Sequence, residues 1–407
     1  MKRAYSELLA KYLKYFPCVA LIGVRQGGKT TFLKELPPGW KVFDLEKQSD
    51  FQTVSADPDV FFRLNEDKVA IDEVQFVPAL FPALRVAIDR DRARAGRFVI
   101  TGSSSPALLG AVSESLAGRV GIIEMAPLTC REAFEVAPGP LYEWFASPGS
   151  SFQPSALNDS MIGIKDVHRY WFYGGYPEPW VKKEPGFHKA WMENYVQTYL
   201  HRDVAGLFPR INRERFRRFL HLLGGFSGAI VNFAEVARAL GVSQPTAQDY
   251  FEIADGTFLW RNVQSFEKRV LKRVVRHPRG YLRDSGLLHH LLRVAGEDDL
   301  DAHPFCGRSW EGMAIEQIIR GLNARGVGFN YSYYRTAGGA EVDLVLEGDF
   351  GLVAVEVKHS QAAGANDLRT LKAFVAEHDC RLGIVVNNDE TARLFDERIA
   401  GVPMGCL

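Results

Sequence analysis

The stretch from Gly23 to Thr30 constrains this chain more than any other, because it fits the phosphate-binding pattern G-x-x-x-x-G-K-[ST]. An apolar run from Cys18 to Ile22 precedes it and predicts a buried strand, and the residues from Thr31 to Leu36 are typical of a helix start. In such a strand–loop–helix the backbone N–H groups and the helix N-terminus surround phosphate oxygens. The sequence therefore predicts a nucleoside triphosphate site. The alternative is a glycine-rich turn at a strand end.

The residue types in this loop match the groups that handle phosphate. Lys29 can reach the β- and γ-phosphates, and the Thr30 hydroxyl can hold Mg²⁺. ATP and Mg²⁺ are therefore the expected cofactors. The loop residues expected to bind them are Gly23, Arg25, Gly27, Gly28, Lys29, Thr30 and Thr31.

A second acidic motif follows the short apolar strand that begins at Val69. Asp72 and Glu73 stand at its carboxyl end. We expect Asp72 to hold the Mg²⁺ shell together with Thr30, and Glu73 to polarise the attacking water. By itself, such a pair is also typical of a solvated turn.

Two further strand ends carry candidate polar residues. The strand 98–101 runs into Gly102 and three serines, so Thr101 or Ser103 could sense the γ-phosphate or the water, unless this is an ordinary turn. Arg119 precedes the strand 120–125, where it could neutralise transition-state charge on a neighbouring subunit's nucleotide. The alternative for Arg119 is a surface ion pair.

The spacing of the apolar strands predicts an α/β fold. Short apolar runs at 18–22, 42–45, 69–72, 97–101 and 120–125 alternate with helical or irregular segments, which is the rhythm of a parallel sheet covered on both faces. The 407 residues exceed what one core supports, so several domains are expected. We expect a nucleotide-binding core at 1–126, a helical lid with a Pro/Gly/Ser-rich surface loop at 127–210, and further domains at 211–300 and 301–407.

These motifs together resemble a family of bacterial and archaeal AAA-type ATPases (AAA_14) joined to a DUF4143 C-terminal region. Val24 and Gly27 depart from the family's usual proline and valine, and neither change removes a phosphate contact. The resemblance implies a P-loop AAA+ ATPase core followed by a helical lid. It rests on these segments in family order: Gly23–Thr31, Ile71–Glu73, Thr101–Ser103, Ser115–Arg119, Pro127–Thr129 with Glu132, Gly174–Pro177 and Arg202–Val204.

A helix-turn-helix pattern appears in the middle of the chain. A helix from Phe233 to Leu240 ends at Gly241, and Ser243 can cap a second helix that begins at Gln244. The segments 258–260 and 263–266 are typical of the strands of a wing. This pattern predicts a winged helix-turn-helix, which serves either as a DNA-binding or as a protein-interaction module.

A basic run follows the helix-turn-helix with no acidic residue inside it. Acidic and basic residues balance at 49 each over the whole chain, so a DNA-binding surface must be local. Such a run favours contacts with DNA phosphates. Its members are Lys268, Arg269, Lys272, Arg273, Arg276 and Arg279.

The C-terminal region carries a second constellation. Asp343 lies on a strand at 341–346, and a tight loop returns the chain along 352–358, where Glu356 and Lys358 share one face. Two carboxylates can hold Mg²⁺ and a neighbouring lysine can position the hydrolytic water. The alternative is a solvated strand face.

This arrangement resembles the PD-(D/E)xK nuclease superfamily, particularly its Holliday-junction-resolvase-like members, over roughly residues 305 to 400. Glu311 matches the additional acidic ligand of that superfamily. The resemblance implies a metal-dependent deoxyribonuclease with Mg²⁺ or Mn²⁺ held by Glu311, Asp343 and Glu356, and with Lys358 at the water. Such a domain can also keep the fold as a DNA-binding or docking unit.

Cysteine spacing and hydropathy argue against several other classes of protein. The five cysteines show no C-x-x-C or Cys/His ligand spacing, which argues against zinc and against a disulfide framework. No apolar run approaches about 18 residues, so no membrane partner and a cytoplasmic location are expected.

The functional hypothesis is an ATPase, forming a homo-oligomeric ring such as a hexamer, that moves or remodels branched, forked or single-stranded DNA which its C-terminal domain cuts. One alternative is a nucleotide-dependent switch whose C-terminal domain binds DNA or a partner without cutting. A transcriptional regulator is the third.

Overall fold

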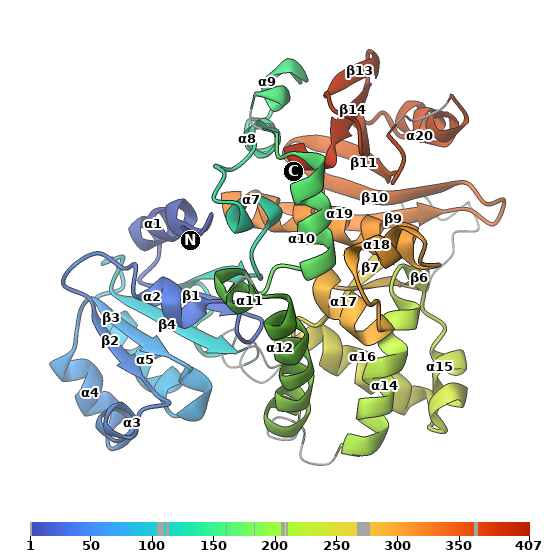
Figure 1. Ribbon diagram of the computed structural model, residues 1–407. Helices are drawn as coiled ribbons and strands as arrows, with labels where there is room; N and C mark the ends of the chain where they lie inside the picture. The colour runs from blue at the N-terminus through green and yellow to red at the C-terminus, as the bar shows by residue number, and fades with distance from the viewer. Residues whose placement is uncertain are drawn as a thin grey trace. The chain divides into compact units, whose positions relative to one another are not determined.

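The computed structural model describes residues 2–103, 110, 114–159, 161–182, 184–204, 208, 211–266, 277–361 and 365–407 (Figure 1). The chain divides into two compact units. The first unit comprises residues 2–127 with 256–258, and the second comprises 128–255 with 259–407.

The first unit is built on a five-stranded sheet in the order β2-β3-β4-β1-β5, and every neighbouring pair in it is parallel. The central strand β1 is buried at all six positions because it has a partner on each side and core residues on each face. The predicted parallel α/β sheet is therefore confirmed. The strands are β1 (Cys18–Gly23), β2 (Lys41–Asp44), β3 (Val69–Asp72), β4 (Phe98–Ser103) and β5 (Val120–Met125).

Short helices connect these strands. In α5 (Leu80–Arg90) the buried residues Leu80, Leu84 and Ile88 recur every four positions, so one face of the helix packs into the core with Ile71. The other elements are α1 (Ser6–Tyr15), α2 (Lys29–Leu33), α3 (Gln48–Ser55), α4 (Pro58–Leu64) and η1 (Val74–Phe76).

The second unit contains a nine-stranded sheet in the order β13-β14-β12-β11-β10-β9-β7-β8-β6. The pairs β11–β12, β12–β14 and β7–β9 are parallel and the others are antiparallel. The strands are β6 (Ala229–Ile230), β7 (Trp260–Ser265), β8 (Arg279–Leu282), β9 (Phe329–Arg335), β10 (Glu341–Gly348), β11 (Gly351–Val357), β12 (Leu382–Asn387), β13 (Arg393–Asp396) and β14 (Ile399–Pro403).

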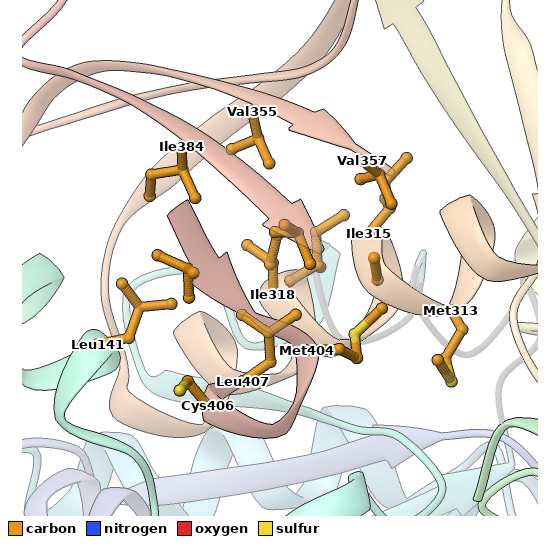
Figure 2. Close-up of a cluster of buried hydrophobic side chains, with 14 of the residues drawn as sticks. Leu141, Met313, Ile315, Ile318, Val355, Val357, Ile384, Met404, Cys406 and Leu407 are labelled. Atoms are coloured by element: carbon orange, nitrogen blue, oxygen red, sulfur yellow. The ribbon is translucent and has the colours of Figure 1, made fainter. Parts of the chain in front are cut away.

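Helix α19 (Cys306–Arg325) lies at the centre of this unit and is buried around most of its circumference. Figure 2 shows Met313, Ile315 and Ile318 of this helix among side chains from β11, β12 and the C-terminal end. The other helices are α7 (Cys130–Ala133), α8 (Pro140–Ala146), α9 (Ser155–Asn158), α10 (Ile164–Tyr173), α11 (Pro177–Lys182), α12 (Pro185–Thr198), the π-helical turn η2 (Tyr199–Val204), α14 (Arg213–Phe226), α15 (Phe233–Leu240), α16 (Gln244–Gly256), α17 (Ser285–Leu292), α18 (Glu297–Asp301), α20 (Ala365–His378) and η3 (Met404–Cys406).

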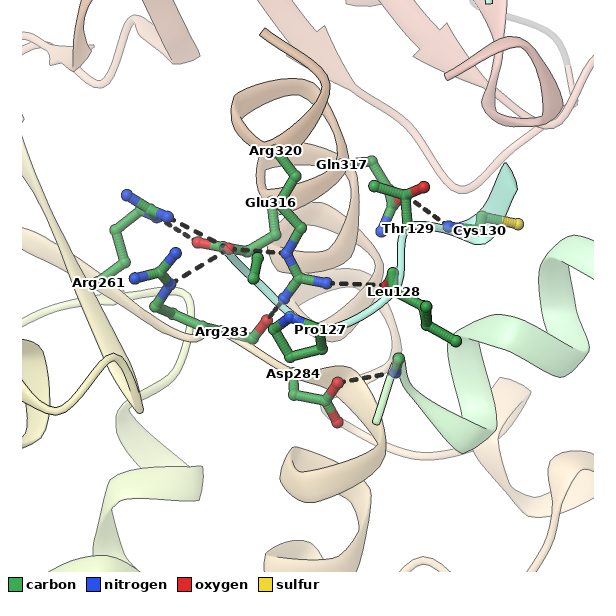
Figure 3. Close-up of polar contacts among 12 residues, drawn as sticks. Pro127, Leu128, Thr129, Cys130, Arg261, Arg283, Asp284, Glu316, Gln317 and Arg320 are labelled. Carbon is green, nitrogen blue, oxygen red and sulfur yellow. Dashed lines mark hydrogen bonds and ion pairs between the residues drawn. The ribbon is translucent and has the colours of Figure 1, made fainter. Parts of the chain in front are cut away.

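A buried ionic cluster holds α19 to the neighbouring strands. Glu316 pairs with Arg261 of β7, with Arg283 beyond β8 and with Arg320 one turn further along α19 (Figure 3). All four side chains are at most 6% exposed. Burial by itself would raise the pKa of Glu316, but the three guanidinium groups overcome that effect and lower it to about 2.

The two helices of the predicted helix-turn-helix are present. Gly241 ends α15 with a positive φ of 63°, and the Asn232 side chain accepts hydrogen bonds from the N–H groups of Ala234 and Glu235. The Ser243 hydroxyl accepts from the Thr246 N–H at 3.3 Å, as expected for a cap. Whether this pair is a DNA-binding winged helix remains a prediction.

Two local expectations are wrong. The segments 258–260 and 263–266 do not form two wing strands, because residues 260–265 make one strand, β7, between β8 and β9. The Pro/Gly/Ser-rich segment 137–160 is more than a surface loop, since α8 within it buries Leu141, Trp144 and Phe145 in the core of the second unit. Among the described helices, none has the length and apolar character needed to cross a membrane.

Candidate functional site

The predicted phosphate loop has the backbone that its glycines imply. A side chain at Gly23 would collide with the carbonyl oxygen of Met125 on the adjacent strand β5, so only glycine fits at the end of β1. Gly28, which precedes α2, has a positive φ of 93° that other residues rarely adopt. The loop therefore closes sharply and starts a helix at Lys29.

Lys29 folds back onto the loop. Its side chain is buried, and Nζ donates hydrogen bonds to the carbonyl oxygens of Gly23 at 3.0 Å and Val24 at 2.9 Å. The ammonium group thus stands inside the loop. Arg25 is half-buried, while Thr30 and Thr31 are exposed.

An arginine that the sequence did not single out also supports the loop. Arg3 is 6% exposed and donates to the carbonyl oxygens of Gly27 and Ala126, each at 2.7 Å. These bonds fix the loop to the segment after β5. No sequence pattern marks Arg3, because its partners lie 24 and 123 residues away.

The acidic motif lies at the carboxyl end of β3, beside β4. The Thr101 hydroxyl donates to the Asp72 carboxylate and accepts from the N–H of Glu73 at 3.2 Å. Burial raises the pKa of Asp72, and hydrogen bonds from Thr101 and Thr30 oppose that rise. Thr30, Asp72 and Thr101 are therefore brought together.

Glu73 has a strained backbone, with a φ of +58° in a residue that is not glycine. Such a conformation costs on the order of 1 to 3 kcal/mol and occurs most often at functional sites. Gln75, which the sequence analysis did not single out, donates to the Glu73 carboxylate. The Glu73 side chain is thus held in place by Gln75.

Two other candidates near the sheet have different surroundings. Ser103 continues β4 opposite Gly23 of β1. Arg119 forms a two-pronged ion pair with Asp89, at 2.7 and 2.9 Å. The surface ion pair is therefore present within one chain, and a role for Arg119 at a neighbouring subunit's nucleotide remains a prediction.

In the second unit, the β10–β11 hairpin and α19 bring acidic residues together. Leu344 pairs with Val355, so Asp343 and Glu356 lie at the same end of the hairpin, and the Val357 N–H donates to the Asp343 carboxylate at 2.9 Å. Lys358 Nζ lies 2.9 Å from Glu356 Oε1. We call Glu311, Asp343, Glu356 and Glu341 the carboxylate cluster.

Keeping all the carboxyl groups of the carboxylate cluster ionised is costly. Burial and then repulsion by Asp343 raise the pKa of Glu356 to about 8, although Lys358 opposes the rise. The same two causes raise the pKa of Glu311 to about 7. Among the described residues, Glu356 Oε2 has no hydrogen-bond partner although it is buried. Buried, mutually repelling carboxylates with an unused oxygen suit a hard divalent cation.

Arg279 is not placed as expected. Its side chain is only 7% exposed. Nη1 donates to Glu311 at 2.9 Å and lies 3.3 Å from Asp343, and Nη2 pairs with Glu341. In this structure it therefore does not face a DNA phosphate, because its guanidinium group is buried against the carboxylate cluster. The other five basic candidates, Lys268, Arg269, Lys272, Arg273 and Arg276, lie outside the described residues.

Tyr281 and Glu341 also belong to this site, although no sequence motif marks them. Tyr281 donates its hydroxyl proton to Glu311, and Glu341 pairs with Arg279. Arg279 and Tyr281 are two residues apart on β8 and so share one face. This two-residue spacing was the signal in the sequence that could have linked Arg279 and Tyr281. Nothing in the local sequence indicates, however, which residues of the fold that face of β8 contacts.

Comparisons with known proteins follow the same division. Residues 15–134 match a family described as AAA domain, residues 306–407 match the domain of unknown function DUF4143, and residues 164–298 match the domain of unknown function DUF8612. Among solved structures, the Walker-type ATPase PABY2304 of Pyrococcus abyssi is 15% identical and covers 72% of this chain and 95% of its own. Its TM-score of 0.43 is too low to establish a shared fold.

Relatives in sequence are more similar. The uncharacterized protein Rv2008c of Mycobacterium tuberculosis is 32% identical over 402 residues, which cover 98% of this chain and 83% of the relative. The uncharacterized protein Mb2031c of Mycobacterium bovis has the same values. An uncharacterized protein of Haemophilus influenzae is 23% identical over 62% of this chain and 58% of its own length. The chain therefore belongs to the family of P-loop ATPase-like proteins, with an AAA domain and a C-terminal DUF4143 region, that includes Rv2008c.

Proposed function

We propose that the first unit hydrolyses ATP. The observation that carries this proposal is the hydrogen-bonded set of Thr30, Asp72 and Thr101 at the carboxyl ends of the sheet. Thr30 and Asp72 would hold Mg²⁺, which supplies positive charge to the phosphates. Lys29 binds the β- and γ-phosphates once its bonds to the loop carbonyls are exchanged for them.

Glu73 acts as the general base in this proposal. It follows Asp72 at the strand end, and its carboxylate is held by Gln75. Thr101 contacts both the Asp72 carboxylate and the Glu73 N–H. In this proposal Thr101 or Ser103 senses whether the γ-phosphate is present. Arg119 of one subunit stabilises charge at the nucleotide of the next, and identical subunits form a ring.

The second unit binds DNA and cuts it. The helices α15 and α16 and the basic run at 268–276 contact DNA phosphates, and the carboxylate cluster cleaves the strand. The unused oxygen of Glu356 supports a metal there, held by Glu311, Asp343 and Glu356. Mg²⁺ or Mn²⁺ supplies charge neutralisation and an acidified water at such a site. Lys358, 2.9 Å from Glu356, orients that water.

The preferred DNA is branched, forked or single-stranded. ATP hydrolysis moves or remodels DNA that the helix-turn-helix region holds, so a structure with strands to separate is its natural target. The proposed function is thus ATP-driven movement or remodelling of DNA coupled to DNA cleavage.

A second candidate is favoured by one observation. Arg279 places a fixed positive charge between Glu311 and Asp343. A carboxylate cluster whose charge is partly balanced by a buried arginine is also compatible with a domain that does not cut DNA. In that case the protein is a nucleotide-dependent switch whose second unit binds DNA or a protein partner.

The decisive experiment incubates the full chain with labelled forks, four-way junctions, single strands and linear duplexes. Each is tested with Mg²⁺ or Mn²⁺, with and without ATP, while phosphate release and strand cleavage are measured together. ATP turnover that rises with DNA, and metal-dependent cleavage of branched forms, support the motor and nuclease. Slow turnover that ignores DNA, with no cleavage under either metal, leaves the switch.

A further inference from the structure

Three potential metal ligands of different chemistry, none of them a member of the carboxylate cluster, converge in the second unit. Asp301 ends α18, Cys306 begins α19, and His359 follows β11. His359 Nδ1 lies 3.9 Å from Cys306 Sγ, and His359 Nε2 lies 3.6 Å from Asp301 Oδ1. One ligand atom from each residue can be chosen so that all three lie within 4.8 Å of one another.

A second histidine stands beside them. The ring centroids of His168, on α10, and His359 are 5.8 Å apart with the planes tilted by 32°. Among the described residues, Nε2 of each ring is buried and lacks a hydrogen-bond partner. His359 Nε2 lies 3.6 Å from the Asp301 carboxylate, which is beyond hydrogen-bond distance. A buried imidazole nitrogen without a hydrogen bond is costly, so each ring has a nitrogen whose lost interaction a bound ion would supply.

The surroundings hold His359 in place and leave room for an ion. Trp310 and Trp171 lie against its ring, with centroids at 5.0 and 5.3 Å. Asn388 Nδ2 donates to the His359 carbonyl oxygen at 2.8 Å. His168, Asp301, His359 and Asn388 line a cavity of about 580 Å³, which gives an ion a path of entry.

We propose that Asp301, Cys306 and His359 bind a transition-metal ion of the zinc class, with His168 as a fourth ligand. Sulfur, nitrogen and oxygen donors together suit zinc or cobalt, whereas the oxygen-only carboxylate cluster suits Mg²⁺. In a tetrahedral zinc shell neighbouring donors are about 3.5 Å apart. Asp301 and Cys306 approach different nitrogens of the His359 ring, at 3.6 and 3.9 Å, and one ion can use only one of these nitrogens. With one donor atom from each residue the set lies within 4.8 Å, so side-chain rotations must bring the donors to the shell spacing.

The site has a structural consequence for the neighbouring chemistry. A bound ion would link α18, the start of α19 and the segment after β11. His359 directly follows Lys358, which pairs with Glu356. Metal binding would thus fix the segment that follows β11 and carries Lys358. The sequence gives no sign of this, because the ligands lie at positions 168, 301, 306 and 359 without any linear metal-binding spacing.

Cobalt titration of the metal-free full chain tests the proposal, because cobalt reports a bound thiolate through a charge-transfer absorption band. We expect the band to saturate at one ion per chain and Zn²⁺ to displace it. C306S should abolish the band, and H359A and D301N should weaken cobalt binding by about tenfold or more. H168N should keep the thiolate band but alter the visible bands that report coordination number.

Matched variants make the outcome specific. C380S removes a buried cysteine outside the site, and D343N alters the carboxylate cluster, so both should keep the band. Circular dichroism in the presence of chelator verifies that each variant is folded, and C306A serves if C306S is not. Absence of a thiolate band, or a band that persists in folded C306S or C306A, overturns the site. Unchanged visible bands in H168N exclude His168 from it.

Discussion

Arg279 Nη1 lies 3.3 Å from Asp343 Oδ1 inside the second unit. Its second partner through the same nitrogen is Glu311, at 2.9 Å. Both carboxylates belong to the set proposed for a divalent cation. A guanidinium group and a metal ion cannot occupy the same place, so they compete for the same two carboxylates.

Replacing Arg279 with methionine should therefore raise metal affinity. R279M keeps the apolar length of the side chain and removes its charge, so the folded protein should bind Mn²⁺ on the order of tenfold more tightly, equivalent to about 1.4 kcal/mol. Calorimetric titration with Mn²⁺ measures this directly. R335M is the matched control, because Arg335 is 40% exposed and contacts only the rim residue Glu341 of this cluster, at 3.5 Å. Unchanged or weaker Mn²⁺ binding in folded R279M would contradict the competition.

At the nucleotide site, Glu73→Gln should keep ATP binding and reduce turnover by on the order of a hundredfold or more, the usual effect of removing a general base. Lys29→Ala should instead weaken binding, because it removes the cation at the β- and γ-phosphates. Phosphate release and equilibrium nucleotide binding separate the two effects. Glu35→Gln, at an exposed position in the same unit, should behave like the parent. If Glu73→Gln hydrolyses ATP at the parental rate, Glu73 is not the base.

For DNA cleavage, Asp343→Ala or Glu356→Ala should abolish metal-dependent cutting while ATP hydrolysis continues, since the two proposed sites lie in different units and would hold separate metal ions. Lys358→Ala should abolish cutting and leave Mn²⁺ binding largely intact. Glu311→Ala should cause a smaller but clear reduction. Gel assays on forked DNA measure these outcomes, with Glu347→Ala, at an exposed position of β10, as the control. Cleavage that survives Asp343→Ala would remove the carboxylate cluster from the reaction.

The sequence predicted the first unit well because its signals are local. Most of its strands are short apolar runs, and the candidate residues lie at or just beyond their carboxyl ends, as with Asp72 at the end of β3. Parallel strands must gather those ends at one edge of the sheet. The loop from Gly23 to Lys29 adds backbone requirements that few residues other than glycine satisfy.

Arg279 shows why the second unit was less predictable. Its partners Glu311 and Asp343 lie 32 and 64 residues further along the chain. A basic run in sequence indicates a surface, but β8 alternates between two faces and directs Arg279 inward. Similarly, the two short segments expected as wing strands proved to be one strand, since pairing with both β8 and β9 extends it through 260–265.

DNA binding can be tested at the remaining basic residues. Neutralising Lys272, Arg273 and Arg276 together should lower DNA affinity. It should also flatten the dependence of log affinity on log salt by about 0.9 for each duplex phosphate that the variant no longer neutralises. Fluorescence anisotropy at several salt concentrations measures the slope. Arg218→Gln, at a 69% exposed position on α14, is the control for removal of a surface charge. An unchanged slope in the triple variant would mean that the basic run does not contact DNA.

The stability of the second unit should depend on pH through Glu316. Three arginines lower the pKa of this buried carboxyl group from 4.5 to about 2, so the folded state binds its proton less readily than the unfolded state. The resulting stability is present above about pH 4.5 and is lost as the pH falls toward 2. At neutral pH, Glu316→Gln should lower the free energy of unfolding by about 3 to 5 kcal/mol, because it removes the one negative charge that the three buried arginines share in this cluster.

Chemical unfolding at a series of pH values checks both parts of this prediction. The difference between the parent and Glu316→Gln should shrink as the pH falls from about 4.5 toward 2, because the parent then becomes neutral at the same position. Glu347→Gln, exposed on β10, should track the parent throughout. A difference that stays constant over this range would show that Glu316 contributes through packing rather than through its charge.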